Sequence, residues 1–409
     1  MKYSLESKLK KLCVGCGACQ GICPQHAINL SNKNGFLSLS VNPKKCSGCG
    51  LCIKICPIYH AALHETPAIG EKDIIGHYNK IYVGYALDEK VRWGGASGGV
   101  ITVLLLKMLK EGLINGALVS RMKGPGVVEA YIARNVKEVL EAQGSIYFPT
   151  YAAKQIRDIR ANDGSYAIVG LPCQITAFKK AERLFLDLSE RVFIYLGLFC
   201  HHVNEFWYLD YFIKKIAKMK LEEVFEVSPR RGGWPGFVQI RSAREAKEIP
   251  FFKFWGPLQL LYLTSPIGCL FCCDHTNVFS DLSFGDAWLP SLMKKDTLGS
   301  SLIIARTSKG SSLLKEAEDD GLISLREVTV KELFESQNAI FYKKKFVSSA
   351  RSFIQGNFNF SLKNCVQLLP LINAKIARKN GFRNLIYALP ESLLGKYAFI
   401  LYKLIENHH

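Results

Sequence analysis

The sequence contains no apolar run of the roughly 18 residues that a membrane-spanning helix needs. Its best candidate, Val100 to Leu106, is stopped by Lys107. The first residues, MKYSLESKLKKL, carry lysines that no apolar core follows, which is unlike a secretory signal peptide. We therefore expect a cytoplasmic protein that has no membrane-spanning helix.

Acidic residues are scarce, with 35 Asp and Glu against 53 Lys and Arg, for a net charge of +18. The excess lies at the two ends, with +7 in residues 1–60 and +9 in residues 341–409, against +2 for the 280 residues between them. A nucleic-acid-binding domain would carry a basic face on its folded body together with a recognisable motif. We find neither in the sequence, so we expect no nucleic acid as a partner.

The length of 409 residues is too great for one ordinary domain, and the composition, 48% apolar and 22% charged, is typical of a folded globular protein. A polar segment with Pro and Gly at 57–73 reads as a linker. The predicted organisation is therefore an N-terminal module at 1–62, a body at 75–340 and a tail at 341–409. Of the 14 cysteines, eight lie in the module, five in the body, and Cys365 is alone in the tail. In a reducing compartment such a number indicates metal binding rather than disulfides.

The module contains an internal repeat, CVGCGACQGICP at 13–24 and CSGCGLCIKICP at 46–57. Each copy has the spacing C-x2-C-x2-C-x3-C-P, in which three cysteines bind one 4Fe-4S cube and the fourth binds the other. Between the copies, Asn34-Gly35 is flanked by two apolar segments and predicts a β-hairpin. A pair of zinc sites is the alternative, but zinc usually shows two separated CxxC pairs. The predicted ligand sets are Cys13, Cys16, Cys19 and Cys56 for one cluster, and Cys23, Cys46, Cys49 and Cys52 for the other.

The body alternates strand-like and helix-like patterns, which predicts an α/β or mixed α+β domain. Strands are expected at 81–87, 117–122, 127–134, 166–170, 192–200, 237–240 and 301–307, and helices at 98–112, 173–184 and 205–218.

Four pieces of the body carry residues suited to chemistry. RWGGASGG, from Arg92 to Gly99, could bind an anionic cofactor group at a helix N-terminus, or could be a loop that only needs tight turns. GLPCQ places Cys173 near a helix N-terminus, where a thiolate would be stabilised, although a buried structural cysteine is the alternative. The third piece contributes Cys200, which two histidines follow; we expect these histidines to face solvent or to support a metal ligand. The fourth piece is the sequence GCLFCC. Cys173, Cys200, Cys269 and either Cys272 or Cys273 offer four ligands for a third 4Fe-4S cluster, with a zinc site or a redox-active dithiol as alternatives.

The ordered set of motifs resembles the family of coenzyme F420 hydrogenase/dehydrogenase beta subunits, and the N-terminal repeat resembles bacterial-type two-cluster ferredoxins. The resemblance rests on SGG, GSIYFPT, GLPCQ, LFCHH, RRGGWPG, and CxxC followed by SFGDAW. It implies a ferredoxin fold followed by a mixed α/β flavin-binding domain that holds FAD and a 4Fe-4S cluster. Together with the basic helical tail expected from the residues at 341–409, the predicted fold class is α+β. The resemblance assigns the third cluster to Cys173, Cys200, Cys269 and Cys272, and the flavin surroundings to Ser97, Gly98, Gly99, Gly144, Ser145 and Tyr147, with Arg92 in the same loop.

The implied function is that of an oxidoreductase. A ferredoxin-like or other donor would supply electrons, and FAD would pass them to a small organic acceptor, which is a deazaflavin or a pathway intermediate such as one of surface-polysaccharide synthesis. A non-catalytic relay subunit serving a partner enzyme is the alternative. The candidate residues on the substrate side are Arg92, Arg230, Arg231, Trp234 and His275. For each arginine taken singly, a solvated charge is the interpretation that we favour. The sequence leaves the catalytic residue and the oligomeric state open.

The tail carries apolar residues at helical spacing with Lys and Arg between them, and Pro370 and Pro390 divide it. A basic amphipathic helix can lie on an anionic membrane surface, which would place the protein peripherally at the inner face of the membrane. A helical cap docked on the body is the alternative that we favour.

Overall fold

The computed structural model describes residues 10, 12–59, 75–254, 257–260, 262–338, 340, 369–376 and 378. Most of the segments expected as linker and tail, and Cys365, lie outside the described residues. In the part of the chain that is described, no helix has the length and apolar character required to cross a bilayer.

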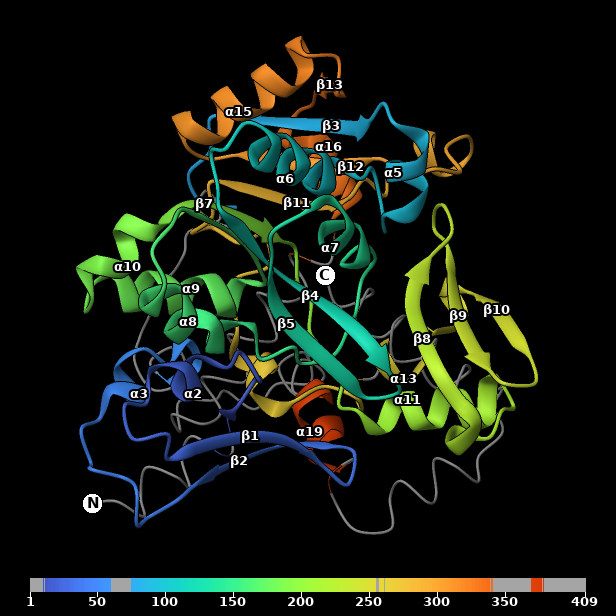
Figure 1. Cartoon of the computed structure of the whole chain (residues 1–409). Helices are drawn as coiled ribbons and strands as arrows, with labels where there is room; N and C mark the ends of the chain where they lie inside the picture. The colour runs from blue at the N-terminus through green and yellow to red at the C-terminus, as the bar shows by residue number, and fades with distance from the viewer. Residues whose placement is uncertain are drawn as a thin grey trace, which may run out of the picture.

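The body is built on an eight-stranded mixed sheet in the order β13-β3-β12-β11-β7-β6-β4-β5 (Figure 1). Neighbours among β4, β6, β7 and β11 pair in parallel, and the remaining pairs are antiparallel. Because parallel strands end at the same edge of a sheet, the residues that follow β6, β7 and β11 are brought together there. The strands are β3 (Lys80–Ala86), β4 (Gly116–Gly124), β5 (Val127–Ala133), β6 (Tyr166–Gly170), β7 (Val192–Leu198), β11 (Leu282–Asp286), β12 (Ser301–Ala305) and β13 (Ile323–Glu327).

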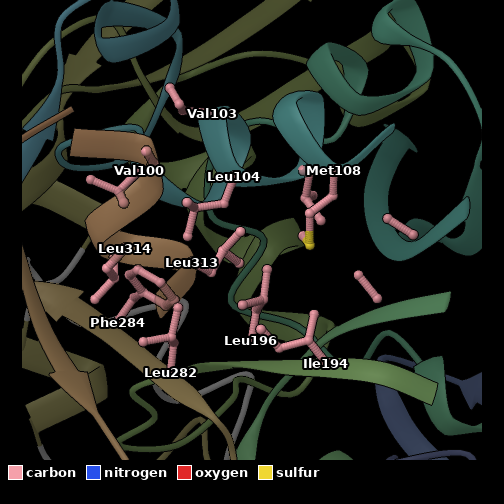
Figure 2. Packing of buried hydrophobic residues seen from close by; sticks show 14 of the residues in the cluster. Val100, Val103, Leu104, Met108, Ile194, Leu196, Leu282, Phe284, Leu313 and Leu314 are labelled. Atoms are coloured by element: carbon pink, nitrogen blue, oxygen red, sulfur yellow. The ribbon is translucent and has the colours of Figure 1, made fainter. Parts of the chain in front are cut away.

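Helices cover both faces of this sheet. Ile194 and Leu196 of β7 pack with α6 (Val100–Lys110) and α15 (Ser308–Asp319), as Figure 2 shows. Tyr195, which points to the opposite face, packs with α8 (Ile156–Ala161), α9 (Pro172–Glu182) and α10 (Leu186–Arg191). This alternation is the period-2 pattern of a strand buried on both faces. Shorter helices are α5 (Glu89–Gly94), α7 (Val136–Glu141), η2 (Ala152–Gln155), α14 (Pro290–Met293) and α16 (Val330–Ser336).

A smaller antiparallel sheet, in the order β10-β9-β8, lies beside the main one (Figure 1). It consists of β8 (Val224–Arg231), β9 (Phe237–Ser242) and β10 (Ala246–Pro250) and shares an aromatic core with α11. The helix expected at 205–218 is shorter than predicted: α11 covers Trp207–Tyr211, and a π-helical turn, η3 (Phe212–Ile216), replaces its second half. Phe212 in that turn is completely buried against Phe254. The remaining short pieces are η4 (Leu221–Glu223), α12 (Phe251–Phe254), α13 (Pro257–Leu260) and η5 (Ile267–Phe271).

The N-terminal module contains the predicted hairpin. Strands β1 (Ile28–Lys33) and β2 (Phe36–Val41) pair with Lys33 opposite Phe36. Asn34 and Gly35 form a two-residue turn with φ of 53° and 85°, the left-handed values that an Asn-Gly turn provides. Two short helices, α2 (Ala18–Ile22) and α3 (Leu51–Lys54), follow the two Cys-Gly loops.

The module docks closely on the body. Gly268 faces the Leu12 carbonyl so closely that a Cβ atom there would lie 2.0 Å from the oxygen. The backbones also bond directly, because the Ala153 amide donates to the Cys16 carbonyl at 2.8 Å and the Trp207 amide donates to the Gly35 carbonyl at 2.8 Å. In the tail, α19 (Leu369–Ile376) packs against η5, which carries Cys269. The cysteine-bearing loops of module and body therefore share one interface.

Candidate iron–sulfur centres and cofactor loops

The two Cys-Gly loops of the module adopt the same backbone conformation. Gly17 and Gly50 both precede their helices with left-handed φ values of 93° and 74°, a conformation that costs glycine little. Equivalent turns in the two copies present their three cysteines in the same way. The structure thus reproduces in space the repeat seen in the sequence.

The thiols of the module fall into two sets. Burial, and then the nearby Cys56, raise the pKa of Cys13 to about 12. Cys16 and Cys19 have Cys13 and Cys56 as electrostatic neighbours, and burial followed by these thiols raises the pKa of each. We call this set the inner set; its members are Cys13, Cys16, Cys19 and Cys56.

The other set lies nearer the surface. Burial, and then repulsion from Cys49, Cys23 and Cys46, raise the pKa of Cys52 to about 11. Cys49 is exposed, whereas the inner set is not. We call Cys23, Cys46, Cys49 and Cys52 the outer set. In each set, three cysteines come from one copy of the repeat and the fourth comes from the other copy.

Both sets suit a 4Fe-4S cube. Backbone amides already point at sulfur, because Ala27 donates to Cys23 Sγ at 3.3 Å and Tyr59 donates to Cys56 Sγ at 3.4 Å. In the described part of the chain, the buried hydroxyl of Tyr151 has no hydrogen-bond partner, and Cys13 is its electrostatic neighbour. A cluster sulfur would accept that hydrogen bond. The raised thiol pKa values mean that binding iron must displace protons from these cysteines.

No three His, Cys, Asp or Glu side chains of the described residues are arranged to hold a single metal ion. A cube takes one thiolate for each of its four irons, so its ligands need not converge on one point.

A third group of thiols forms at the carboxyl edge of the parallel strands. Cys173 begins α9 after β6, and Cys200 follows β7. The electrostatic neighbours of Cys173 are Cys16, Cys200, Cys272 and Cys269. The turn at 269–272 is closed by a bond from the Cys272 amide to the Cys269 carbonyl at 3.2 Å. The structure therefore brings together the four body thiols that the sequence singled out.

The expectation that the helix N-terminus stabilises a Cys173 thiolate is wrong for the free thiol. Burial, and then the surrounding thiols, raise the pKa of Cys173 well above its usual value. Cys173 is half-buried, and the few N–H groups at the start of α9 do not compensate for this loss of water and for the neighbouring thiols. Cys273 lies at the same apolar cluster as Cys272.

The inner set and the body thiols adjoin one another. Among the thiols that raise the pKa of Cys173, Cys16 has the largest effect. Both side chains pack against the apolar cluster that holds Val14 and Leu270. The close approach of Gly268 to Leu12 holds the module against the turn that carries Cys269. The inner set and the body thiols therefore lie next to each other.

Of the two histidines that follow Cys200, His202 is buried and His201 is half-buried; His275, which lies near them, is also buried. His202 is 5% exposed and His275 is 6% exposed. The Tyr262 hydroxyl lies 2.7 Å from His201 Nε2, and the His201 and His275 ring centres are 6.1 Å apart. The Cys200 amide donates to the His275 carbonyl at 2.9 Å. The histidines thus support the strand ends that carry the cysteines.

The glycine-rich and arginine-rich motifs meet in a second place, a cluster of loops between the main sheet and the small sheet. The Ser97 and Ser301 hydroxyls are 2.9 Å apart, and the Trp234 amide donates to the Thr297 carbonyl at 2.7 Å. Arg231 reaches the Gln143 carbonyl at 2.8 Å, next to Gly144. We call this group the loop cluster; it consists of residues 92–99, 143–147, 230–236, 286–288 and 296–301.

The structure places every residue expected around the flavin in the loop cluster. Gly98 and Gly99 lie against Ser301 and the Arg92 backbone, and Gly144 lies against the Arg230 carbonyl. Tyr147 has a φ of 63° and its hydroxyl accepts from Arg230 at 3.1 Å. Glycine at 98 and 144 allows close packing, because a Cβ atom would lie 2.5 Å from the Gly84 carbonyl oxygen and 2.8 Å from the Arg230 carbonyl oxygen, respectively.

The arginines expected on the substrate side are not solvated. Arg92 pairs with Asp296 at 2.9 Å and lies over the Tyr85 ring at 3.9 Å. The Arg230 side chain, 2% exposed, pairs with both carboxylate oxygens of Asp286, at 2.9 and 2.6 Å. Burial opposes the charge on Arg230, but Asp286 outweighs it and raises the pKa of the guanidinium overall.

Trp234 completes this arrangement, because its indole N–H donates to Asp286 at 2.9 Å. Its ring lies 4.6 Å from that of Trp288.

A separate hollow of about 300 Å³ elsewhere on the body is lined by Tyr131, Asp158 and Asn162 among others, and by none of the cysteines or loop-cluster residues.

Sequence reasoning missed the carboxylates that hold these arginines. Asp286 ends β11 within the SFGDAW motif, so its place at a parallel strand end was a usable signal. Asp296 lies in a polar loop, 204 positions from its partner Arg92, and has no comparable signal. Glu205 and Arg378, described below, are a further pair of this kind.

Comparisons with known proteins agree with this arrangement. Two profiles describe the two ends of the coenzyme F420 hydrogenase/dehydrogenase beta subunit. The N-terminal profile matches residues 81–157, and the C-terminal profile matches residues 163–331. The profile of a 4Fe-4S dicluster domain matches residues 12–59.

Several curated relatives are similar over most of the chain. The coenzyme F420 hydrogenase of Methanothermobacter thermautotrophicus has a beta subunit that is 24% identical, over 62% of this chain and 86% of the relative. The corresponding beta subunit in Methanosarcina barkeri is 21% identical, over 63% of this chain and 85% of the relative. The coenzyme F420-dependent sulfite reductase of Methanocaldococcus jannaschii is 25% identical, over 78% of this chain and 48% of the relative.

A solved structure shares the fold. It is a chain of the F420-reducing [NiFe] hydrogenase complex from Methanosarcina barkeri, with a TM-score of 0.55 and 20% identity. The similarity covers 72% of this chain and 95% of that chain.

Proposed function

Because the chain belongs to the family of coenzyme F420 hydrogenase/dehydrogenase beta subunits and carries a 4Fe-4S dicluster domain, we propose that it is an iron–sulfur flavoprotein oxidoreductase. Electrons from a ferredoxin-type donor pass through the N-terminal clusters and a third cluster to FAD. They then reduce a small organic acceptor, either a deazaflavin or a pathway intermediate such as one of surface-polysaccharide synthesis. The observation that carries the proposal is the proximity of Cys16 to Cys173: the two thiols are electrostatic neighbours and pack against the same apolar cluster.

The structure supports an order of transfer from the surface inward. The outer set includes the exposed Cys49, the inner set lies behind it, and the body thiols adjoin the inner set through Cys16. Each group brings its own four cysteines, and a 4Fe-4S cube supplies one-electron transfer when bound. The chain itself determines the spatial order of the three groups of thiols and shields the inner set and the body thiols from water.

The donor side is basic. Lys44, Lys45 and Lys54 are all exposed beside the outer set. Such a patch would attract an acidic electron-carrier protein and increase its association rate, an effect that salt screens. Replacing the three lysines by glutamine should slow reduction by the carrier and weaken its salt dependence, while reduction by dithionite is unchanged.

The loop cluster is the proposed flavin site. Ser97, Gly98 and Gly99 precede α6. Gly144, Ser145 and Tyr147 lie in a second loop, which the Gln143 side chain joins to α5 by donating to the Val91 carbonyl at 2.8 Å. FAD supplies the conversion between one-electron and two-electron transfer when it is bound. Arg92 and Arg230 hold the loops in place through their carboxylate partners.

A non-catalytic relay subunit is the second candidate. The pairing of Arg92 with Asp296 and of Arg230 with Asp286 favours it, because those cations are already committed to carboxylates. The two candidates differ in flavin content. Anaerobically purified protein that binds no FAD, even when FAD is supplied, would support the relay subunit.

The tail determines whether the protein acts at a membrane surface. One alternative is that the basic tail binds an anionic membrane; the other is that it is a helical cap docked on the body, which the packing of α19 on η5 favours. Flotation with anionic liposomes, with and without residues 360–409, separates the two alternatives.

The proposed path is tested by a matched pair of variants, Cys173→Ser and Cys273→Ser. We expect Cys173→Ser to lose about four irons per chain and to block flavin reduction by a donor that reduces the outer set. Cys273→Ser should keep both properties, because Cys272 is the neighbour that acts on Cys173. Unchanged flavin reduction in Cys173→Ser would contradict the path.

A further inference from the structure

A buried carboxylate connects the tail to the module. Glu205 is 1% exposed, and its Oε2 atom accepts from the Leu37 amide at 2.6 Å. Its Oε1 atom forms an ion pair with Arg378, which follows α19 in the tail. A carboxylate this deeply buried stays ionised only when it is paired and hydrogen-bonded, and here both oxygens have partners.

Arg378 lies beside the inner set. Its guanidinium is positioned over the Phe36 ring at 5.4 Å, next to Leu37 of β2, whose side chain packs in the cluster that contains Cys13 and Cys19. Within the described residues, the buried Nε atom of Arg378 has no hydrogen-bond partner. Burial lowers the pKa of Arg378, and the nearby Cys13 opposes that shift.

The position of α19 is fixed independently of this pair. The helix packs against η5, the turn that carries Cys269. Figure 1 shows α19 close to the N-terminal hairpin of β1 and β2. A segment far along the chain therefore contacts the turn that carries Cys269 and brings the Arg378 cation to the module.

We infer that Arg378 and Glu205 together set the reduction potential of the inner-set cluster, with the tail serving as part of that centre. Reduction adds one negative charge to a cluster, which a nearby guanidinium stabilises and a nearby carboxylate destabilises. Arg378 is a positioning and charge-setting residue that makes no bond to iron. The inference rests on the proposed function, since it requires a cluster at Cys13, Cys16, Cys19 and Cys56.

The test is an anaerobic redox titration of the full-length protein, followed by electron paramagnetic resonance. Arg378→Gln removes the cation and, at an alkaline pH that keeps the unpaired Glu205 ionised, should lower the inner-set potential. Glu205→Gln removes the anion, keeps the Arg378 cation and should raise the inner-set potential. The glutamine oxygen can still accept from the Leu37 amide. Each shift should correspond to about a tenfold change in the equilibrium constant for reduction, which is 59 mV for one electron. The double variant should return close to the wild-type value.

Two controls separate charge from damage to the structure. Arg378→Lys keeps the charge and should keep the wild-type potential, and the outer-set signal should not move in any variant. Shifts of the same sign in both single variants, no shift in either, or a shifted potential in Arg378→Lys would overturn the inference. If the wild-type protein shows no inner-set signal, the proposed function fails instead, which is a distinct outcome.

Discussion

Replacing Arg230 by alanine should destabilise the body by several kcal/mol. The guanidinium is 2% exposed and makes two bonds to Asp286, one to the Pro235 carbonyl at 2.9 Å and one to the Tyr147 hydroxyl at 3.1 Å. Breaking a buried ion pair by removing one partner costs about 3–5 kcal/mol, because a charge is left without compensation. The Asp286 side chain is 20% exposed, so water would relieve part of this cost. We therefore expect about 3–4 kcal/mol.

The assay is urea unfolding followed by tryptophan fluorescence under anaerobic conditions. With a slope of about 3 kcal/mol per molar urea, the loss corresponds to a decrease in the midpoint of about 1 M at unchanged slope. FAD retention should fall in parallel, because Arg230 holds Tyr147 and the loop that carries Trp234 and Pro235.

The control is Arg230→Lys, which keeps the charge but cannot make the two-pronged contact with a carboxylate. We expect an intermediate midpoint. A midpoint for Arg230→Ala within about 0.2 M of the wild type would refute the conclusion that this pair holds the loop cluster.

Two further predictions concern other parts of the fold. Gly268→Val should separate the Cys269 turn from the module, since a Cβ atom would lie 2.0 Å from the Leu12 carbonyl oxygen; accelerated tryptic cleavage between module and body would show this, and a wild-type cleavage pattern would contradict it. Glu332→Gln should lower the melting temperature at pH 7, because the Thr329 amide and then Arg326 hold the pKa of Glu332 below its usual 4.5. That stabilisation is present above pH 4.5 and is lost as the pH falls through the lower folded-state pKa, so a difference that persists at about pH 2 would count against it.

The cysteine pattern was sufficient to predict the grouping of the thiols. Spacing along the chain fixes which residues wrap one cluster in the module, and Cys173 and Cys200 follow β6 and β7, whose parallel ends must meet. The hairpin at Asn34-Gly35 was equally readable, because its turn needs residues that tolerate a positive φ.

Long-range polar partners could not be predicted in this way. Arg378 pairs with Glu205 across 173 positions of the sequence, and no periodicity marks such a pair. Strand β8 was missed because it ends in the Arg-Arg of a glycine-rich motif that reads as a loop. The general exposure of arginine favoured solvated side chains, but the burial of Arg92 and Arg230 depends on the carboxylates that the fold places opposite them.

The central claim, that the chain holds three 4Fe-4S clusters and one FAD, is tested most directly by counting cofactors. Protein should be purified anaerobically and analysed for iron, acid-labile sulfide and flavin in the same sample. The account predicts about twelve irons, about twelve sulfides and one FAD per chain, given four irons and four sulfides in each cube. About eight irons without flavin would contradict it, leaving only the two clusters of the N-terminal module.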